Sequence, residues 1–127
     1  MNKIIYTTFL IIVFHVNNAF SQETTSTLKG YVRDSFGNNM PFANVLVTND
    51  ETGISYGISS DLSGYFIVPQ LPPDKSYTIK VTSLGFKEVL FSNVSLNLGK
   101  TTTLSVVLNE DDTLLEEVVV ISRNNEL

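Results

Sequence analysis

The side chains that most often perform catalysis are almost absent from this chain. Its 127 residues include a single histidine, His15, and no cysteine or tryptophan. His15 lies in an apolar N-terminal segment that we expect to be removed, so Ser-His or Cys-His catalysis and His- or Cys-ligated zinc or iron sites are excluded. Carboxylates alone can do general acid and base work, but the acids here lie mostly in expected turns. The sequence therefore predicts a non-catalytic binding or structural module without a cofactor.

Four acidic residues in these turns could still bind a metal ion. Carboxylate oxygens are preferred ligands of calcium, so the four would form a weak calcium site if they gathered at one end of the domain. The alternative is that each one caps the backbone of its own turn, which is the commoner role of such residues. The four residues are Asp50, Glu51, Asp61 and Asp74.

The N-terminal segment has the composition of a secretory signal peptide. Residues 1–3 carry a positive charge, residues 4–16 are mostly apolar, and the small residues Ala19 and Ser21 are spaced for signal peptidase. The apolar run is shorter than the roughly 20 residues that cross a bilayer. No cysteine is present for the acylation of a lipoprotein. We therefore expect residues 1–21 to be a signal peptide and the remaining chain to be exported.

The charge of the chain excludes one large class of partners. Thirteen acidic residues outnumber eight lysines and arginines, which gives a formal net charge of -5. The lysines are scattered, and no basic stripe is present that could neutralise phosphates. We therefore expect no nucleic-acid partner, and an anionic membrane surface is also a poor candidate.

The remaining residues predict one small all-β domain. Short apolar or alternating runs recur between Gly, Pro, Asn and Asp, without sustained helical periodicity. The expected strands are 27–33, 43–47, 55–59, 64–68, 77–83, 88–92 and 101–108. Seven strands suit two packed sheets. Alternation along the strands predicts that the core contains Val45, Val47, Phe66, Val68, Tyr77, Ile79, Val81, Leu104, Val106 and Leu108.

Two connections between the expected strands have clear turn signals. Residues 49–53 combine Asn, Asp and Gly and predict a hairpin connection. In the second connection, Asp61 can accept hydrogen bonds from backbone amides two residues further on, and Gly64 can adopt a positive φ.

The chain becomes acidic and then strongly apolar after the last expected strand. A β-branched run has high β propensity, and its unpaired edge invites another chain to pair with it when it lies outside a finished domain. The alternative is an extra strand of the sandwich. We call this run the tail segment, and its residues are Glu116, Glu117, Val118, Val119, Val120, Ile121 and Ser122.

The succession of motifs in the expected domain resembles that of carboxypeptidase regulatory-like domains. The matching stretches are the Gly-x-Val-x-Asp opening at 30–34, the Pro-to-Val strand at 41–47, the Asp-x-x-Gly-x-Phe turn at 61–66, the Tyr-x-Ile-x-Val strand at 77–81, and the closing Gly85-Phe86. The ordered set is more specific than any one of these motifs alone. It implies a seven-stranded prealbumin-like or Ig-like β-sandwich over residues 22–109, followed by an acidic linker and tail at 110–127.

This resemblance implies a role in transport when the tail segment is added. In Bacteroidota, TonB-dependent outer-membrane receptors carry such a domain directly after the signal peptide, and a short acidic and apolar TonB box follows it. The tail segment resembles that box, which would add as a strand to the C-terminal domain of TonB. The domain would then lie at the periplasmic face of the outer membrane, attached to the plug and barrel of the same receptor. A barrel needs hundreds of residues, so we expect this chain to be either the front part of a receptor or a short standalone relative.

Two further hypotheses remain open. A standalone periplasmic or secreted module could bind a glycan or a protein partner, with Tyr31, Tyr56 and Tyr65 as part of the contact surface. An accessory folding domain of a secreted hydrolase, such as a metallocarboxypeptidase, is the third hypothesis. The position of the tail separates the first two hypotheses, because a tail locked into the sandwich would favour the standalone module.

Overall fold

The computed structural model describes residues 1–14 and 24–113, which form one helix and seven strands. The elements are α1 Asn2–Phe14, β1 Ser26–Asp34, β2 Asn44–Asn49, β3 Ser55–Ser59, β4 Tyr65–Leu71, β5 Lys75–Thr82, β6 Val89–Leu96 and β7 Thr101–Leu108. The predicted all-β sandwich of seven strands is confirmed. In the part of the chain that the structure describes, no helix is both long and apolar enough to span a bilayer.

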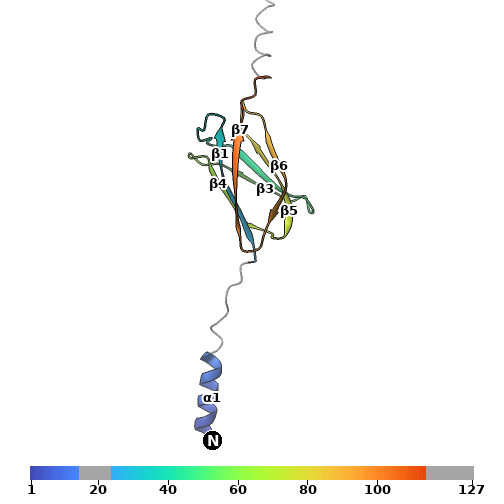
Figure 1. Cartoon of the computed structure of the whole chain (residues 1–127). Helices are drawn as coiled ribbons and strands as arrows, with labels where there is room; N and C mark the ends of the chain where they lie inside the picture. Colours follow the sequence, from blue (N-terminus) through green and yellow to red (C-terminus); the bar gives the residue numbers. More distant parts are fainter. Residues whose placement is uncertain (15–23, 114–127) are drawn as a thin grey trace, which may run out of the picture.

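The strands form two sheets that pack face to face (Figure 1). The three-stranded sheet has the order β4-β1-β7, and the four-stranded sheet has the order β3-β2-β5-β6. Strand β1 pairs antiparallel with β4 and parallel with β7. The pairs within the four-stranded sheet are all antiparallel. Because one face of each sheet is covered and the other is solvated, the strands alternate between buried and exposed residues.

The core lies between the two sheets and contains the residues that alternation predicted. Nine of the ten predicted core residues are buried, and Leu104 is half-buried and packs against the others. The core is completed by Leu28, Val32, Met40, Ala43, Leu71 and Leu96. All of these side chains lie within residues 28–108, so the described domain has a complete core of its own and folds as one unit.

Gly30 and Phe66 show why two of the sequence motifs occur together. A Cβ atom on Gly30 would lie 2.7 Å from the ring of Phe66 and would also collide with the carbonyl oxygen of Leu104. Because Gly30 has no side chain, there is room for the ring of Phe66, its partner on the neighbouring strand β4. Phe66 is fully buried. These motif residues serve the packing of the sandwich.

Strands β4 and β6 extend furthest beyond the ends that the sequence predicts. Strand β4 continues to Leu71 through Pro69, which is tolerated because β4 is an edge strand of its sheet. Strand β6 continues to Leu96 because its pairing with β5 shifts register between Tyr77 and Ile79. A register shift interrupts the simple alternation that sequence analysis relies on.

The loops gather at two opposite ends of the sandwich. Asp34 pairs with Leu108, and Asn44 pairs with Ser59 and Thr82, so the loops next to these residues lie at one end. We call this end the tail end, and it comprises residues 35–43, 60–64, 83–88 and 109–113. We call the opposite end the base, and it comprises residues 50–54, 72–74 and 97–100. Figure 1 shows β7 rising from the base to the tail end, from which residues 109–113 continue.

Candidate interaction sites

The predicted partner-binding site lies outside the described residues. This holds for Glu116, Glu117 and the rest of the tail segment, and for the expected cleavage position after Ser21. The structure does describe the stretch that leads into the tail segment. The position of this stretch decides from which part of the domain the tail begins.

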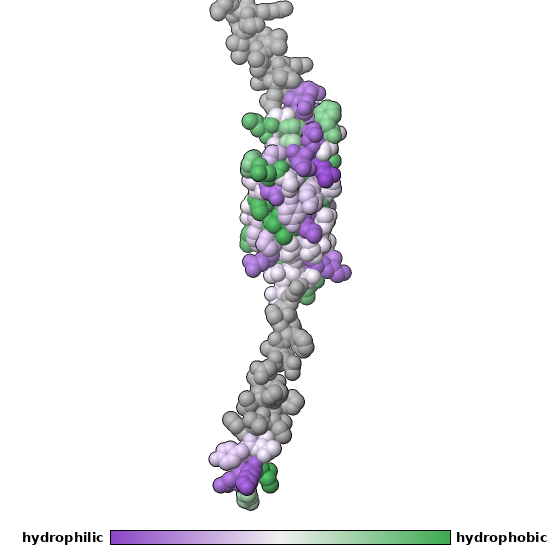
Figure 2. All heavy atoms as spheres, turned by 90° about the vertical axis from the view of Figure 1, so that its left-hand side faces the viewer, coloured by the Kyte–Doolittle hydropathy of each residue, from purple (hydrophilic) through white to green (hydrophobic). Residues whose placement is uncertain are grey.

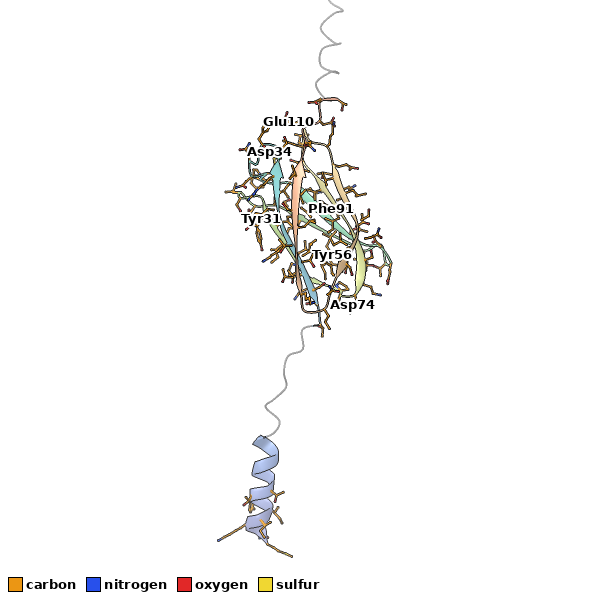
Figure 3. The ribbon with its side chains drawn as sticks, in the orientation of Figure 1. Tyr31, Asp34, Tyr56, Asp74, Phe91 and Glu110 are labelled. Atoms are coloured by element: carbon orange, nitrogen blue, oxygen red, sulfur yellow. The ribbon has the colours of Figure 1, made fainter. Side chains whose placement is uncertain are left out.

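Residues 109–113 are attached to the loop between β5 and β6. The amide of Lys87 donates to the carbonyl oxygen of Asn109 at 2.8 Å, and the amide of Asp111 donates to the carbonyl oxygen of Gly85 at 2.9 Å. Phe86 and Glu110 form an isolated β-bridge between these two bonds. The chain is therefore held at the tail end until at least Asp111, as Figure 3 shows for Glu110.

Asp111 also organises the residues that follow it. Its carboxylate accepts hydrogen bonds from the Thr113 hydroxyl at 2.6 Å and from the Thr113 amide at 3.2 Å. The hydroxyl bond is the main reason why the pKa of Asp111 is lowered. The acidic linker thus begins with an ionised, capped turn.

Four large apolar side chains protrude into solvent at the tail end. Their exposed fractions are far above those expected for such residues in a folded domain. Several hydrophobic side chains can be seen protruding from this half of the domain in Figure 2. We call this group the apolar tip; it consists of Phe36 (79% exposed), Phe42 (69%), Leu62 (78%) and Leu84 (97%). Sequence analysis did not single them out, although large apolar residues among turn formers were a visible signal.

Asp34 shapes the loop that carries Phe36. Its carboxylate accepts hydrogen bonds from the amide of Phe36 at 2.9 Å, and from the amide and side-chain nitrogen of Asn38 at 2.8 and 2.9 Å. The side-chain bond from Asn38 is the main cause that lowers the pKa of Asp34. The loop therefore winds around the carboxylate, and the Phe36 ring is left outside it.

Asp61 shapes the loop that carries Leu62, as the sequence predicted. Its carboxylate accepts bonds from the Ser63 amide at 2.8 Å, the Ser63 hydroxyl at 2.7 Å and the Tyr65 amide at 2.9 Å. The Ser63 hydroxyl is the main cause that lowers the pKa of Asp61. Gly64 has a φ of 77°, and a side chain there would collide with the carbonyl oxygen of Val32. The predicted turn chemistry of Asp61 and Gly64 is confirmed.

The calcium site suggested by the sequence is wrong. Asp61 lies at the tail end, whereas Asp50, Glu51 and Asp74 lie at the base, so the four residues do not gather. Within residues 1–14 and 24–113, no group of three or more acidic residues could hold a metal ion. The physical reason is that the length of β3 separates Asp61 from the acids at the base.

Asp50 and Glu51 at the base form hydrogen bonds and an ion pair with neighbouring polar side chains. Asp50 accepts bonds from the hydroxyls of Ser76 and Thr78, both at 2.8 Å. Glu51 forms an ion pair with Lys75 at 2.7 Å, and this hydrogen bond is the main cause that raises the pKa of Lys75. Figure 3 shows Asp74 at this end of the domain.

A shallow groove crosses the outer face of the four-stranded sheet. Its volume is about 400 Å³, and it is lined by Leu46 and Leu90 together with Thr48, Asp50, Thr78 and Lys80. The polar lining could hydrogen-bond to a small polar ligand. Within the domain, the Asp50 carboxylate in this lining already accepts two hydrogen bonds.

The three tyrosines suggested as a binding surface are only partly brought together. The rings of Tyr31 and Tyr65 lie 5.2 Å apart on the outer face of the three-stranded sheet, and the guanidinium of Arg33 lies 5.9 Å from the centre of the Tyr31 ring. Tyr56 belongs to the other sheet and packs against the core. Figure 3 shows Tyr31 and Tyr56 in separate parts of the domain.

Comparison with family models identifies the class of this domain. Residues 27–109 match the model of the carboxypeptidase regulatory-like domain, and this match covers more than half of the chain. The chain therefore belongs to this family, which agrees with the motifs and with the two-sheet structure. A search of curated proteins gives no match.

Solved structures with a similar fold have low sequence identity to this chain. The Bacillus anthracis TIE protein gives a TM-score of 0.58 at 15% identity, covering 68% of this chain and 17% of that chain. A catechol 1,2-dioxygenase variant from Acinetobacter radioresistens gives 0.52 at 13% identity, covering 68% and 53%. Hydroxyquinol 1,2-dioxygenase from Pseudomonas putida gives 0.52 at 8% identity, covering 73% and 59%. This chain thus spans less than two thirds of each of these chains, and the likeness concerns the fold alone.

Proposed function

We propose that this chain is the periplasmic N-terminal extension of a TonB-dependent outer-membrane transporter for nutrient uptake, and that its tail segment docks to TonB. The observation that carries the proposal is the order of its parts. An apolar start is followed by a carboxypeptidase regulatory-like domain, and the acidic and β-branched tail segment comes directly after that domain.

The described part of the chain supports this arrangement. Among the described residues, the buried side chains that form the core all lie within residues 28–108. Among the described strands, β7 is hydrogen-bonded only to β1, and residues 109–111 continue along the loop between β5 and β6. The chain therefore leaves the core at the tail end, and a partner can bind the tail segment without unfolding the domain.

Strand addition is the mechanism that fits such a segment. An extended peptide that joins the edge of a partner's sheet gains affinity from backbone hydrogen bonds, while alternate side chains set the register. In the tail segment, Val118 and Val120 would face one side of the partner's sheet, and Val119 and Ile121 would face the other. Tension that TonB applies to the tail segment would be transmitted to the plug of the receptor.

The test is calorimetric titration of the chain from Gln22 onward with the C-terminal domain of TonB. We expect Val119→Pro to weaken binding at least tenfold, because proline removes a backbone donor from the ladder. The melting temperature should not change, because the core lies within residues 28–108. Asn125→Pro is the matched control beyond the segment and should bind like the original chain. Equal binding by the Val119→Pro variant would contradict the proposal.

A standalone glycan- or protein-binding module is the second candidate. The observation that favours it is the outward-facing pair of Tyr31 and Tyr65 with Arg33 above the Tyr31 ring. Aromatic faces and a guanidinium are common in contact surfaces. Under this candidate, Tyr31→Ala would abolish partner binding, whereas Val119→Pro would leave it intact.

A further inference from the structure

The four residues of the apolar tip come from loops that meet at the tail end. Asn44 pairs with both Ser59 and Thr82, so Phe42 lies between the loop that carries Leu62 and the loop that carries Leu84. The amide of Phe42 donates to the carbonyl oxygen of Ser60 at 3.0 Å, which fixes this position. An exposed group of large apolar side chains on a folded domain usually marks an interaction site.

Phe42 is the member of the tip with the most unusual backbone. Its φ is 57°, in the left-handed region that large side chains rarely adopt. The ring is nevertheless 69% exposed, so core packing does not explain the choice of phenylalanine. Glycine would adopt this conformation without strain. Unfavourable backbone conformations tend to occur at functional positions, and Phe42 combines one with an exposed aromatic ring.

The charges around the tip restrict what can cover it. Asp34, Asp61 and Asp111 lie in the same loops or at their borders, and the acids Glu110 and Asp112 flank Asp111. Among the described residues, the loops of the tail end contain a single lysine, between β5 and β6. An anionic surface would therefore be repelled, whereas a neutral apolar interface would accept the four side chains.

We propose that the apolar tip inserts into the interface of a bilayer made of zwitterionic lipids, and so docks the tail end on the membrane. This inference rests on the proposed function, which would turn the tail end toward the outer membrane. Residues 109–113 leave the core at the tail end, and in a transporter the segment after them leads to the outer membrane. Separate protruding loops can enter a soft lipid interface without a partner of complementary shape, and binding then scales with the apolar area buried.

The test uses residues 22–113 and vesicles of phosphatidylcholine in a co-sedimentation assay. This part of the chain has a complete core, and it leaves out α1 and the tail segment, whose apolar residues would bind lipid themselves. We expect binding to the neutral vesicles. Replacing a quarter of the lipid by phosphatidylglycerol should weaken it, because the acidic loops repel anionic lipid.

Two variants and one control locate the contact. Phe42→Gly should weaken binding about tenfold without loss of thermal stability, because glycine suits the φ of 57°. Leu62→Ser should also weaken binding. Leu98→Ser removes an apolar side chain that is 50% exposed at the base, and should bind like the original domain.

Three results would overturn the inference. The first is the absence of binding to phosphatidylcholine vesicles, and the second is equal loss of binding in the Leu62→Ser and Leu98→Ser variants. The third is self-association in lipid-free buffer that Phe42→Gly abolishes, measured by sedimentation velocity, since a second copy would then cover the tip. TonB binding in solution is measured separately and depends on Val119, so either proposal can fail without the other.

Discussion

The two ends of the sandwich differ in the hydrogen-bond partners of their acidic side chains and in the exposure of their apolar side chains. At the base, Glu51 pairs with Lys75, and Asp50 accepts bonds from two hydroxyls of β5. At the tail end, Asp34 and Asp61 accept bonds mainly from the amides of their own loops. The apolar tip is then left in solvent, with exposed fractions from 69% to 97%.

This contrast is the reason why we place the proposed contact surface at the tail end. Polar side chains at the base bond across neighbouring strands and stabilise the domain. Those of the tail end hold loops in shapes that direct apolar side chains outward. Asp34 and Asp61, which belong to the family motifs, hold the shapes of their loops. The apolar side chains of the same loops, Phe36 and Leu62, are exposed to solvent.

The largest effect should come from the core that both ends share. We expect Phe66→Ala to lower the free energy of unfolding by about 3–5 kcal/mol, because it leaves a cavity next to Gly30. Urea unfolding followed by circular dichroism measures this loss. Amide hydrogen exchange should show both ends losing protection together. A variant as stable as the original domain would contradict the placement of Phe66 at the centre.

Two glycines with similar φ values give a matched comparison of the ends. Gly53 at the base has a φ of 72° and open space where a side chain would lie, whereas Gly64 has a φ of 77° and faces the carbonyl oxygen of Val32. We expect Gly53→Ala to cost about 1–2 kcal/mol. Gly64→Ala should cost about 1–3 kcal/mol more, because the new methyl group displaces backbone. Equal losses in urea unfolding would show that the tail end is not packed as described.

Acid should weaken the tail end through its capping carboxylates. Hydrogen bonds lower the pKa of Asp34 and Asp61 in the folded state. The folding stability that these two carboxylates contribute is therefore fully present above the ordinary Asp pKa of about 4. It is lost as the pH falls through their lowered pKa in the folded state. The double variant Asp34→Asn, Asp61→Asn should show a flatter loss of melting temperature below about pH 4. An acid transition as steep as that of the original domain would rule out this role.

The smallest effect should come from the ion pair at the base. The side chains of Lys75 and Glu51 are 40% and 58% exposed, so water screens their attraction. Glu51→Gln should therefore change the melting temperature by less than about 2 °C at moderate salt. A larger drop that disappears in high salt would mean that the base depends on this pair more than its exposure indicates.

The sequence was sufficient to predict the strands and most of the core. Alternation placed Tyr77, Ile79 and Val81 on one face because β5 is a regular strand with one solvated side. The order of the strands was not predictable in this way, because the parallel pairing of β1 with β7 depends on contacts far apart in the sequence. Local patterns carry no information on such pairings.

The candidate sites were harder to predict than the fold. The calcium suggestion failed because the direction of β3 places Asp61 and Asp50 at opposite ends, which no spacing of acids reveals. Phe42 follows Pro41 and was expected to lead into a strand, but β2 begins only at Asn44. The positive φ of Phe42 accompanies its bond to Ser60, a tertiary contact. Large apolar residues among turn formers were a sequence signal for the apolar tip, but their exposure and their position at one end of the domain come from the structure.

The central claim is that this domain is the front part of a larger outer-membrane transporter. The most direct test is to probe native membrane and periplasmic fractions with an antibody raised against residues 22–113. Our account predicts a band several times larger than this chain in the outer-membrane fraction. A soluble periplasmic band at the size of the chain itself would contradict it and would favour the standalone binding module.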